Sequence, residues 1–166
     1  MGTRSLTRVI PRQEGIAYDK GHKMIKKSII NMYQQYDGYP SYVGVKLAEF
    51  IKPIKIINGI SGSVKIGEYA NGPGCLAAQI VQEFKHDVGY TYLHECDGDI
   101  GDLGEEYIYT LYPKEGEPTY ISIYDVYEKY VMFVGTADEL IKKYKLKEQS
   151  EAVSYTHLTL PTKRIV

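Results

Sequence analysis

The stretch MYQQYDGYPSYVG, residues 32–44, gathers side chains that could bind an aromatic ligand. Tyrosine rings offer stacking faces, and glutamine amides offer hydrogen bonds without charge. Stacking of a nucleobase on an aromatic side chain contributes about 1–3 kcal/mol, so this chemistry suits a nucleobase or a ribose. The candidate ligand-binding residues of this stretch are Tyr33, Gln35, Tyr36, Asp37 and Tyr39. The alternative is a tyrosine-rich structural corner, because Asp37-Gly38 and Tyr39-Pro40 are also turn dipeptides.

Two further groups of residues could bind the phosphates of such a ligand. Arg4 and Arg8 lie on a neighbouring candidate strand, and a guanidinium group can meet a phosphate through two parallel hydrogen bonds. A glycine-rich helix start offers free N–H groups and the positive end of the helix dipole. The candidate anion-binding residues at such a start are Asn71, Gly72, Gly74 and Cys75. The alternative for this second group is a tight strand-to-helix turn without a ligand.

The hexapeptide GPGCLA, residues 72–77, also matches the dinucleotide-binding pattern G-x-G-x-x-A. Glu95 follows about 20 residues later, where that pattern places its ribose-binding acid. A dinucleotide-binding sheet needs repeated strand–helix–strand units, however, and this chain continues into hairpins instead. The pattern is therefore interpreted as a helix start and not as a dinucleotide fold.

Cys75 would lie in the first turn of that helix, a position that favours a thiolate nucleophile. His86 or His94 could then act as its base, although nothing in the sequence brings either of them close. The simpler interpretation of Cys75 is a small buried residue that packs against the sheet.

The loop HECDGD, residues 94–99, and Asp102 offer carboxylates to a metal. A calcium loop that begins at Asp97 would need a bidentate acid at its twelfth position, which Ile108 occupies. A zinc site would need more cysteines or histidines at set spacing. We therefore expect a solvated acidic loop, with no metal and no cofactor.

The chain has 166 residues, which suits one domain with a hydrophobic core. Its net charge of −1 argues against duplex nucleic acid, which needs clustered lysines and arginines. Two cysteines make no disulfide framework. The first residues lack the apolar core of a signal peptide. No apolar run approaches the roughly 20 residues of a membrane helix. We expect a soluble, cytoplasmic protein. The 17 tyrosines, with no tryptophan, favour a sheet with aromatic cross-strand pairs.

Residues 153–162, VSYTHLTLPT, back-translate into the end of a transposon adapter that is used to prepare DNA sequencing libraries. We therefore expect residues 153–166 to be a disordered tail that derives from the adapter. Residues 1–152 are expected to form the single domain, and its natural C-terminus would then be truncated.

Alternating patterns predict strands at residues 3–10, 23–35, 90–94, 106–112, 119–126 and 130–134. We expect the second strand to pair with the first, and the last three strands to form an antiparallel meander. Helical spacing predicts a helix that begins at the cap Ser41 and ends near Lys52, before Pro53. A second helix follows the Gly-Pro-Gly turn, and the capping box TADE, residues 136–139, begins a third. Residues 55–67 have no clear assignment. Because helices and hairpins fall in separate blocks, we predict one α+β domain with an antiparallel or mixed sheet of about six strands and about three helices, mainly on one face.

Four blocks carry a resemblance to a known group of proteins: MGTRSLT, MYQQYDGYPSYVGVKLAEF, NGPGCLAAQIVQEF and GEEYIYTLY. Together they resemble a family of small proteins from bacteriophages and prophages. The resemblance implies a phage origin and no particular activity. The family usually has Arg where this chain has Gln34, and Gly-His where it has Tyr42-Val43. Those differences argue against any role that needs a cation or an imidazole at these positions.

These observations lead to three hypotheses on function. The first is a binding protein, not an enzyme, that sequesters a nucleotide-derived ligand, such as a host immune signalling nucleotide, in the cytoplasm of the infected bacterium. The second is an enzyme that hydrolyses such a nucleotide, with Asp37, Glu105, Glu106 or a histidine as general base. The third is an interaction module that blocks a host protein. A homo-oligomer is compatible with each. The first hypothesis expects Tyr39 and Gly74 to share one hollow.

Overall fold

The computed structural model describes residues 2–11, 28–60, 62, 64–95, 101 and 103–145 of the chain. Its main element is a six-stranded sheet in the order β5-β2-β1-β6-β7-β8, and β3 and β4 form a two-stranded sheet. The main sheet consists of β1 (Ser5–Val9), β2 (Asn31–Gln34), β5 (Thr91–Leu93), β6 (Tyr107–Lys114), β7 (Glu117–Asp125) and β8 (Tyr130–Thr136). The other elements are the π-helical turn η2 (Pro40–Gly44), α1 (Val45–Ile51), β3 (Lys55–Ile57), β4 (Tyr69–Asn71), α2 (Gly72–Phe84) and a last helix, residues 137–145. The predicted α+β class is confirmed.

The main sheet is mixed, because β1 pairs antiparallel with β2 and parallel with β6. The remaining ladders are antiparallel, between β5 and β2 and from β6 through β7 to β8. The predicted pairing of the first two strands and the predicted meander are therefore confirmed. Ser5, at the start of β1, lies opposite Gln34, at the end of β2. The tyrosine-rich stretch leaves the sheet at this end.

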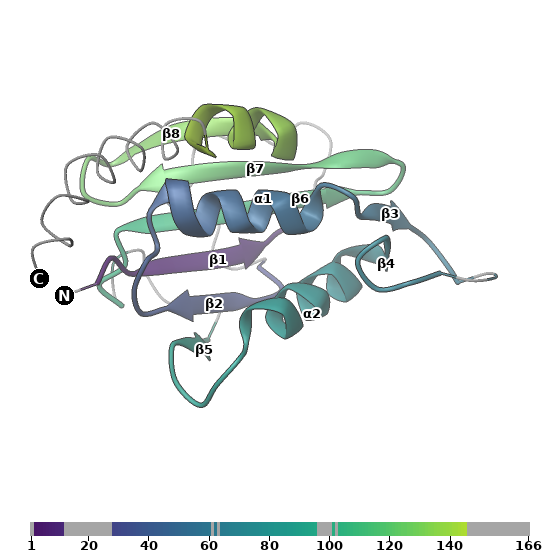
Figure 1. The fold of residues 1–166 in the computed structure, drawn as a ribbon, viewed down its shortest axis with the longest axis horizontal. Coiled ribbons are helices and arrows are strands. Elements are labelled where there is room, and N and C mark those ends of the chain that lie inside the picture. Colours follow the sequence, from purple (N-terminus) through teal and green to yellow (C-terminus); the bar gives the residue numbers. More distant parts are fainter. Residues whose placement is uncertain are drawn as a thin grey trace, which may run out of the picture.

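The helices α1 and α2 and the last helix cover one face of the main sheet, as predicted (Figure 1). Side chains alternate along a strand, so every second residue of the sheet faces these helices. The sheet contributes Val9, Met32, Tyr109, Leu111, Ile121 and Ile123 to the core between the two layers. The helical layer contributes Val43, Leu47, Ile51, Leu76, Ile80 and Leu140. Each fully buried aliphatic side chain contributes roughly 1.5–3 kcal/mol to stability. This shared core therefore holds the helices against the sheet.

Ser41 is not the cap of the first helix, and that prediction was wrong. The cap is Tyr39, whose backbone is extended at φ −74° and ψ 158°, and Pro40 occupies the first helical position. Proline suits this position because it has no N–H group to leave unpaired and its φ is already helical. The other end agrees with the prediction, since α1 finishes at its C-cap Lys52, before Pro53.

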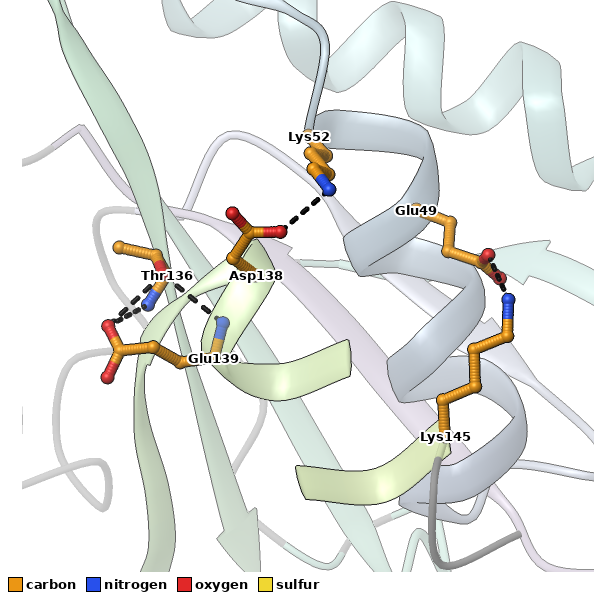
Figure 2. Close-up of polar contacts among 6 residues, drawn as sticks. All are labelled: Glu49, Lys52, Thr136, Asp138, Glu139 and Lys145. Atoms are coloured by element: carbon orange, nitrogen blue, oxygen red, sulfur yellow. Dashed lines mark hydrogen bonds and ion pairs between the residues drawn. The ribbon is translucent and has the colours of Figure 1, made fainter. Parts of the chain in front are cut away.

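The predicted capping box at the start of the last helix is confirmed. The N–H of Glu139 donates to Oγ1 of Thr136 at 3.3 Å, and the N–H of Thr136 donates to Oε1 of Glu139 at 3.2 Å. Figure 2 shows that the same helix is joined to α1 by two ion pairs. These ion pairs link Lys52 to Asp138 at 2.7 Å and Lys145 to Glu49 at 2.8 Å.

One strand prediction differs from the structure, and one segment without an assignment contains a strand. Of the predicted strand at residues 23–35, only Asn31–Gln34 forms a strand among the described residues, while residues 28–30 do not. β-Branched residues favour extended backbone but do not require a ladder partner. Residues 55–67, which had no assignment, contain β3, and β3 pairs in parallel with β4.

The topology also excludes the dinucleotide fold. β4 leads directly into α2, as that fold requires, but β4 pairs with the short β3. The next strand, β5, then joins the edge of the main sheet antiparallel to β2. A repeated parallel unit is therefore missing from the described part of the chain.

Some predictions concern residues outside the described ranges. They include residues 23–27 of the second predicted strand, residues 96–99 and Asp102 of the acidic loop, and the tail at residues 153–166. Within the described ranges, no helix has the length and apolar character needed to cross a membrane.

Candidate functional site

Four tyrosines from two distant segments meet at the end of the sheet where β1 begins. Tyr36, Tyr39 and Tyr42 come from the predicted stretch, and Tyr90 directly precedes β5. The ring centroids of Tyr36 and Tyr90 lie 4.6 Å apart, and those of Tyr39 and Tyr42 lie 6.0 Å apart. Tyr36, Tyr39 and Tyr42 are nevertheless 47%, 38% and 38% exposed. We call these four residues the tyrosine cluster.

Tyr90 is the centre of this cluster. The pKa of Tyr90 is raised to about 12, mainly by burial and in addition by electrostatic repulsion from Tyr42, Asp37, Tyr36 and Tyr39. The Tyr36 ring contacts that of Tyr90 directly, and Tyr42, Asp37 and Tyr39 lie near enough for their charges to act on its hydroxyl group. That hydroxyl stays protonated at neutral pH, so it can donate a hydrogen bond to a ligand.

The backbone of the cluster is held in a strained conformation. Tyr90 has φ 75° and Asp37 has φ 59°, although a bulky side chain rarely adopts the left-handed region. For a bulky residue such as Tyr90 this conformation costs about 1–3 kcal/mol and persists only where its surroundings impose it, whereas aspartate tolerates it better. Here the N–H of Gln35 donates to the carbonyl oxygen of Tyr90 at 3.0 Å and ties the two segments together.

Gly38 anchors the tyrosine loop to the sheet. Its N–H donates to the carbonyl oxygen of Thr3 at 2.8 Å, and its own carbonyl accepts the hydroxyl of Tyr109 at 2.6 Å. A Cβ atom at Gly38 would lie 2.6 Å from the Cβ of Ser5, so a side chain does not fit there. Tyr109 is fully buried, and burial raises its pKa well above the usual value. Its neutral hydroxyl therefore holds the loop at any physiological pH.

Lys46 supplies a cation that the sequence analysis missed. Its Nζ lies 5.6 Å from the ring centroid of Tyr42 and 5.4 Å from that of Phe84. Among the described residues, no carboxylate forms an ion pair with Lys46. Tyr42 and Lys46 are four residues apart, the spacing that brings side chains together on a helix, so the sequence did contain this signal. Tyr90 carried no comparable local signal.

Arg4 lies in a pocket at the same end of the sheet. The pocket has a volume of about 520 Å³ and is lined by Gly2, Arg4, Gly101, Gly104, Glu105, Glu106, Val126 and Tyr127. A Cβ atom at Gly104 would lie 2.7 Å from Nη1 of Arg4, so the missing side chain gives the guanidinium its space. No ion pair of Arg4 is found within the described ranges. We call this cavity the Arg4 pocket.

Glu105 organises the loop beside the Arg4 pocket, and Gly2 joins the pocket to the tyrosine cluster. Glu105 accepts the N–H of Gly101 at 2.6 Å and that of Leu103 at 3.1 Å, so both carboxylate oxygens organise the loop. Glu105 therefore has a structural role, and Glu106 is the acid left for ligand contacts. Gly2 lines the pocket and also packs directly against Tyr36. The Arg4 pocket and the tyrosine cluster are thus neighbours.

The structure does not bring Arg8 into this site. Arg8 is only 2% exposed, and its Nε donates to Oδ1 of Asn31 at 3.2 Å. Asn31 in turn donates through Nδ2 to the carbonyl oxygen of Glu95. Arg4 and Arg8 are four strand residues apart, about 13 Å. The sequence predicted both arginines on one strand, but β1 covers only Ser5–Val9, so Arg4 directly precedes it. The pattern also did not show that every residue of β1, Arg8 included, is buried.

The predicted hollow between Tyr39 and Gly74 is not formed, because α1 and α2 run in opposite directions (Figure 1). Lys46, in the first turn of α1, contacts Phe84 at the end of α2. The start of α2 is therefore a full helix length away, about 20 Å for 13 residues. The side chain of Asn71 is also occupied, since its Oδ1 accepts the N–H of Gly59 at 2.7 Å. The predicted anion-binding group Asn71, Gly72, Gly74 and Cys75 is thus separate from the tyrosines.

The remaining candidates are also apart from the tyrosine cluster. The ring of Tyr33 lies 6.3 Å from that of Tyr92 and 5.5 Å from that of His94, on the edge of the sheet. Cys75 contacts Gln79 through Sγ at 3.5 Å. His86 follows the far end of α2, about 16 Å along the helix from Cys75, so it cannot serve as the base of a thiol.

Among the residues that the structure describes, no group of three His, Cys, Asp or Glu side chains could hold a metal ion. Comparisons with protein-family models, with curated proteins and with solved structures found no match to this chain.

Proposed function

We propose that this protein binds a small nucleotide-derived ligand on the tyrosine cluster and does not convert it. The convergence of Tyr36, Tyr39 and Tyr42 around Tyr90 carries this proposal, because a protein rarely leaves several large rings exposed side by side without a use. Stacking on one such ring contributes about 1–3 kcal/mol per base. The backbone strain at Tyr90 fits a surface that is ordered before the ligand arrives.

Lys46 and Arg4 are the proposed phosphate contacts. Lys46 lies beside the Tyr42 ring, so a phosphate next to a stacked base can reach it. The Arg4 pocket, at about 520 Å³, falls within the usual 300–1,000 Å³ of small-molecule sites. A ligand with a second phosphate or ribose extends past Gly2 into this pocket. A phage protein of this kind would sequester a signalling nucleotide in the cytoplasm of its bacterial host, in keeping with the resemblance described above.

A panel of cyclic nucleotides and ADP-ribose derivatives, measured by thermal shift, tests the proposal. A ligand at 100 times its dissociation constant adds about 2.7 kcal/mol to stability, so a clear rise in Tm is expected. Tyr39→Leu should weaken binding by roughly 5- to 150-fold, the equivalent of one lost stacking contact. Tyr130→Leu is the matched control, because Tyr130 is 51% exposed but lies on β8. The proposal is rejected if no compound raises the Tm.

The same experiment separates binding from catalysis. A ligand that is recovered intact after heat denaturation supports binding. A converted ligand would support the enzyme hypothesis instead, and Glu106 and Asp37 would then be the carboxylates to test as general base.

The exposure of Tyr36, Tyr39 and Tyr42 also favours a second candidate function, a protein-binding surface. Tyrosine is enriched in protein interfaces because its ring is apolar while its hydroxyl can form hydrogen bonds. A partner captured from bacterial lysate by the protein, and not by its Tyr39→Leu variant, would support this function in place of nucleotide binding.

A further inference from the structure

Asp37 lies between Tyr36 and Tyr39 in the chain and is a carboxylate without a partner among the described residues. Within the described part of the chain, its side chain forms no hydrogen bond and no ion pair. It is half-buried, and it lies close enough to the Tyr90 hydroxyl to repel its ionised form. An acceptor held beside aromatic rings is suited to the donor groups of a stacked base.

Backbone hydrogen bonds fix the loop on both sides of Asp37. On one side the N–H of Gln35 bonds to Tyr90, and on the other the N–H of Gly38 bonds to Thr3. Asp37 itself has φ 59°, a conformation that aspartate and asparagine tolerate better than other residues with side chains. The backbone that carries this carboxylate is therefore fixed before a ligand binds.

We infer that Asp37 makes the tyrosine cluster selective for guanine nucleotides. Guanine presents two adjacent donors, the N1–H and the N2 amino group, which match the two oxygens of a carboxylate. Adenine and cytosine each place an acceptor nitrogen beside the amino group, and uracil flanks its N–H with two carbonyl oxygens. A carboxylate would therefore face a lone pair on each of those bases. This inference rests on the proposed function, since it names the base that the cluster binds.

The remaining contacts fit the same ligand. The base stacks on an exposed ring of the cluster, Asp37 accepts the two N–H groups of its edge, and Lys46 holds the phosphate beside Tyr42. The hydroxyl of Tyr90 can donate to the O6 carbonyl oxygen of guanine, which lies next to N1–H. No residue of the Arg4 pocket is needed for a mononucleotide.

Isothermal titration with GMP, AMP and xanthosine monophosphate tests the inference. GMP should bind about 10-fold more tightly than AMP, in the range of one bidentate base contact. Asp37→Asn should remove most of that preference. It should also improve binding of xanthosine monophosphate, because xanthine carries a carbonyl where guanine has its amino group, and the asparagine amide can donate to it.

Asp87→Asn is the matched control, since it removes the same charge from an exposed residue shortly before Tyr90. It should leave the ratio of GMP to AMP affinity unchanged. The control thereby separates the loss of a base contact from the reduced repulsion of the ligand phosphate that any lost negative charge would cause. Because asparagine tolerates the backbone of residue 37, the variant should fold, and its Tm checks this. Equal affinities for GMP and AMP would overturn the guanine inference and leave nucleotide binding intact. If GMP, AMP and xanthosine monophosphate all fail to bind, and no compound of the wider panel raises the Tm, the guanine inference and the proposed nucleotide binding are both overturned.

Discussion

Tyr109 and Tyr144 are two buried tyrosines that differ in what their hydroxyl groups contact. The Tyr109 hydroxyl donates to the carbonyl oxygen of Gly38, whereas that of Tyr144 has no partner among the described residues. We predict that Tyr109→Phe lowers the free energy of unfolding by about 1–3 kcal/mol, because the Gly38 carbonyl is left buried and unpaired. Tyr144→Phe should be close to neutral or stabilising, because it removes a buried hydroxyl that bonds to nothing. Urea denaturation of both variants measures the difference.

The same pair of variants tests how the loop is anchored. Tyr109→Phe should also weaken ligand binding, because Gly38 adjoins Asp37 and Tyr39, and Tyr144→Phe should not. Equal losses of stability in the two variants would contradict the assigned role of the Tyr109 hydroxyl.

Sequence alone identified part of the site at this scale, for a simple physical reason. Tyr36, Asp37 and Tyr39 are neighbours in the chain, so any tight turn brings them together. Tyr90 joins them only through the pairing of β5 with β2. Arg8 was assigned to the wrong environment, because a strand pattern does not say which of its residues the rest of the chain covers.

The last helix is an element whose stability depends on its start. Thr136 and Glu139 satisfy each other's N–H groups there, whereas the ion pairs to α1 are exposed (Figure 2). We predict that Thr136→Ala lowers the free energy of unfolding by about 1 kcal/mol. Asp138→Asn should cost less, because an exposed ion pair contributes little and salt screens it. Thermal denaturation in low and high salt measures both effects. A larger loss from Asp138→Asn than from Thr136→Ala would contradict this ranking.

The type of a helix or strand was predictable where residues close together in the chain determine it. The residues at which an element begins and ends were less predictable. The meander and the capping box depend on residues close together in the chain, and both were predicted. Ser41 was chosen as a cap because serine usually is one, yet Pro40 takes the first helical position and moves the cap to Tyr39. The short β3 had no signal of its own, because its partner β4 lies beyond an irregular loop.

Across the whole molecule, the direction of α2 decided which predicted residues could meet. The sequence predicted about three helices, mainly on one face of a sheet, and Figure 1 confirms that layer. It did not contain their relative direction, which follows from the path through β3 and β4. The end of α2, and not its glycine-rich start, therefore lies near the tyrosines. The tyrosines and the glycine-rich start of α2, which were predicted to share one ligand, therefore lie at opposite ends of the helical layer.

Tyrosines with raised pKa values occur throughout the molecule, which makes its stability sensitive to alkaline pH. Burial is the main cause in each case, and it raises the pKa of Tyr90 and of Tyr144 to about 12 and that of Tyr107 to above its usual value. The unfolded chain releases these protons near the ordinary value of 10. The folded state therefore binds more protons than the unfolded state between about pH 10 and 12. Their contribution is fully present below pH 10 and is lost as the pH rises towards 12.

We predict that the free energy of unfolding falls as the pH rises from 10 to 12, and that the double variant Tyr90→Phe and Tyr144→Phe shows a shallower fall. Lysines also lose their charge in this range, but they do so in both proteins, so the difference between the two curves isolates the tyrosines. Urea denaturation at each pH gives the free energies, and the absorbance of tyrosinate reports ionisation in the folded state. Parallel curves, or ionisation of every tyrosine near pH 10 before unfolding, would show that burial does not hold these protons.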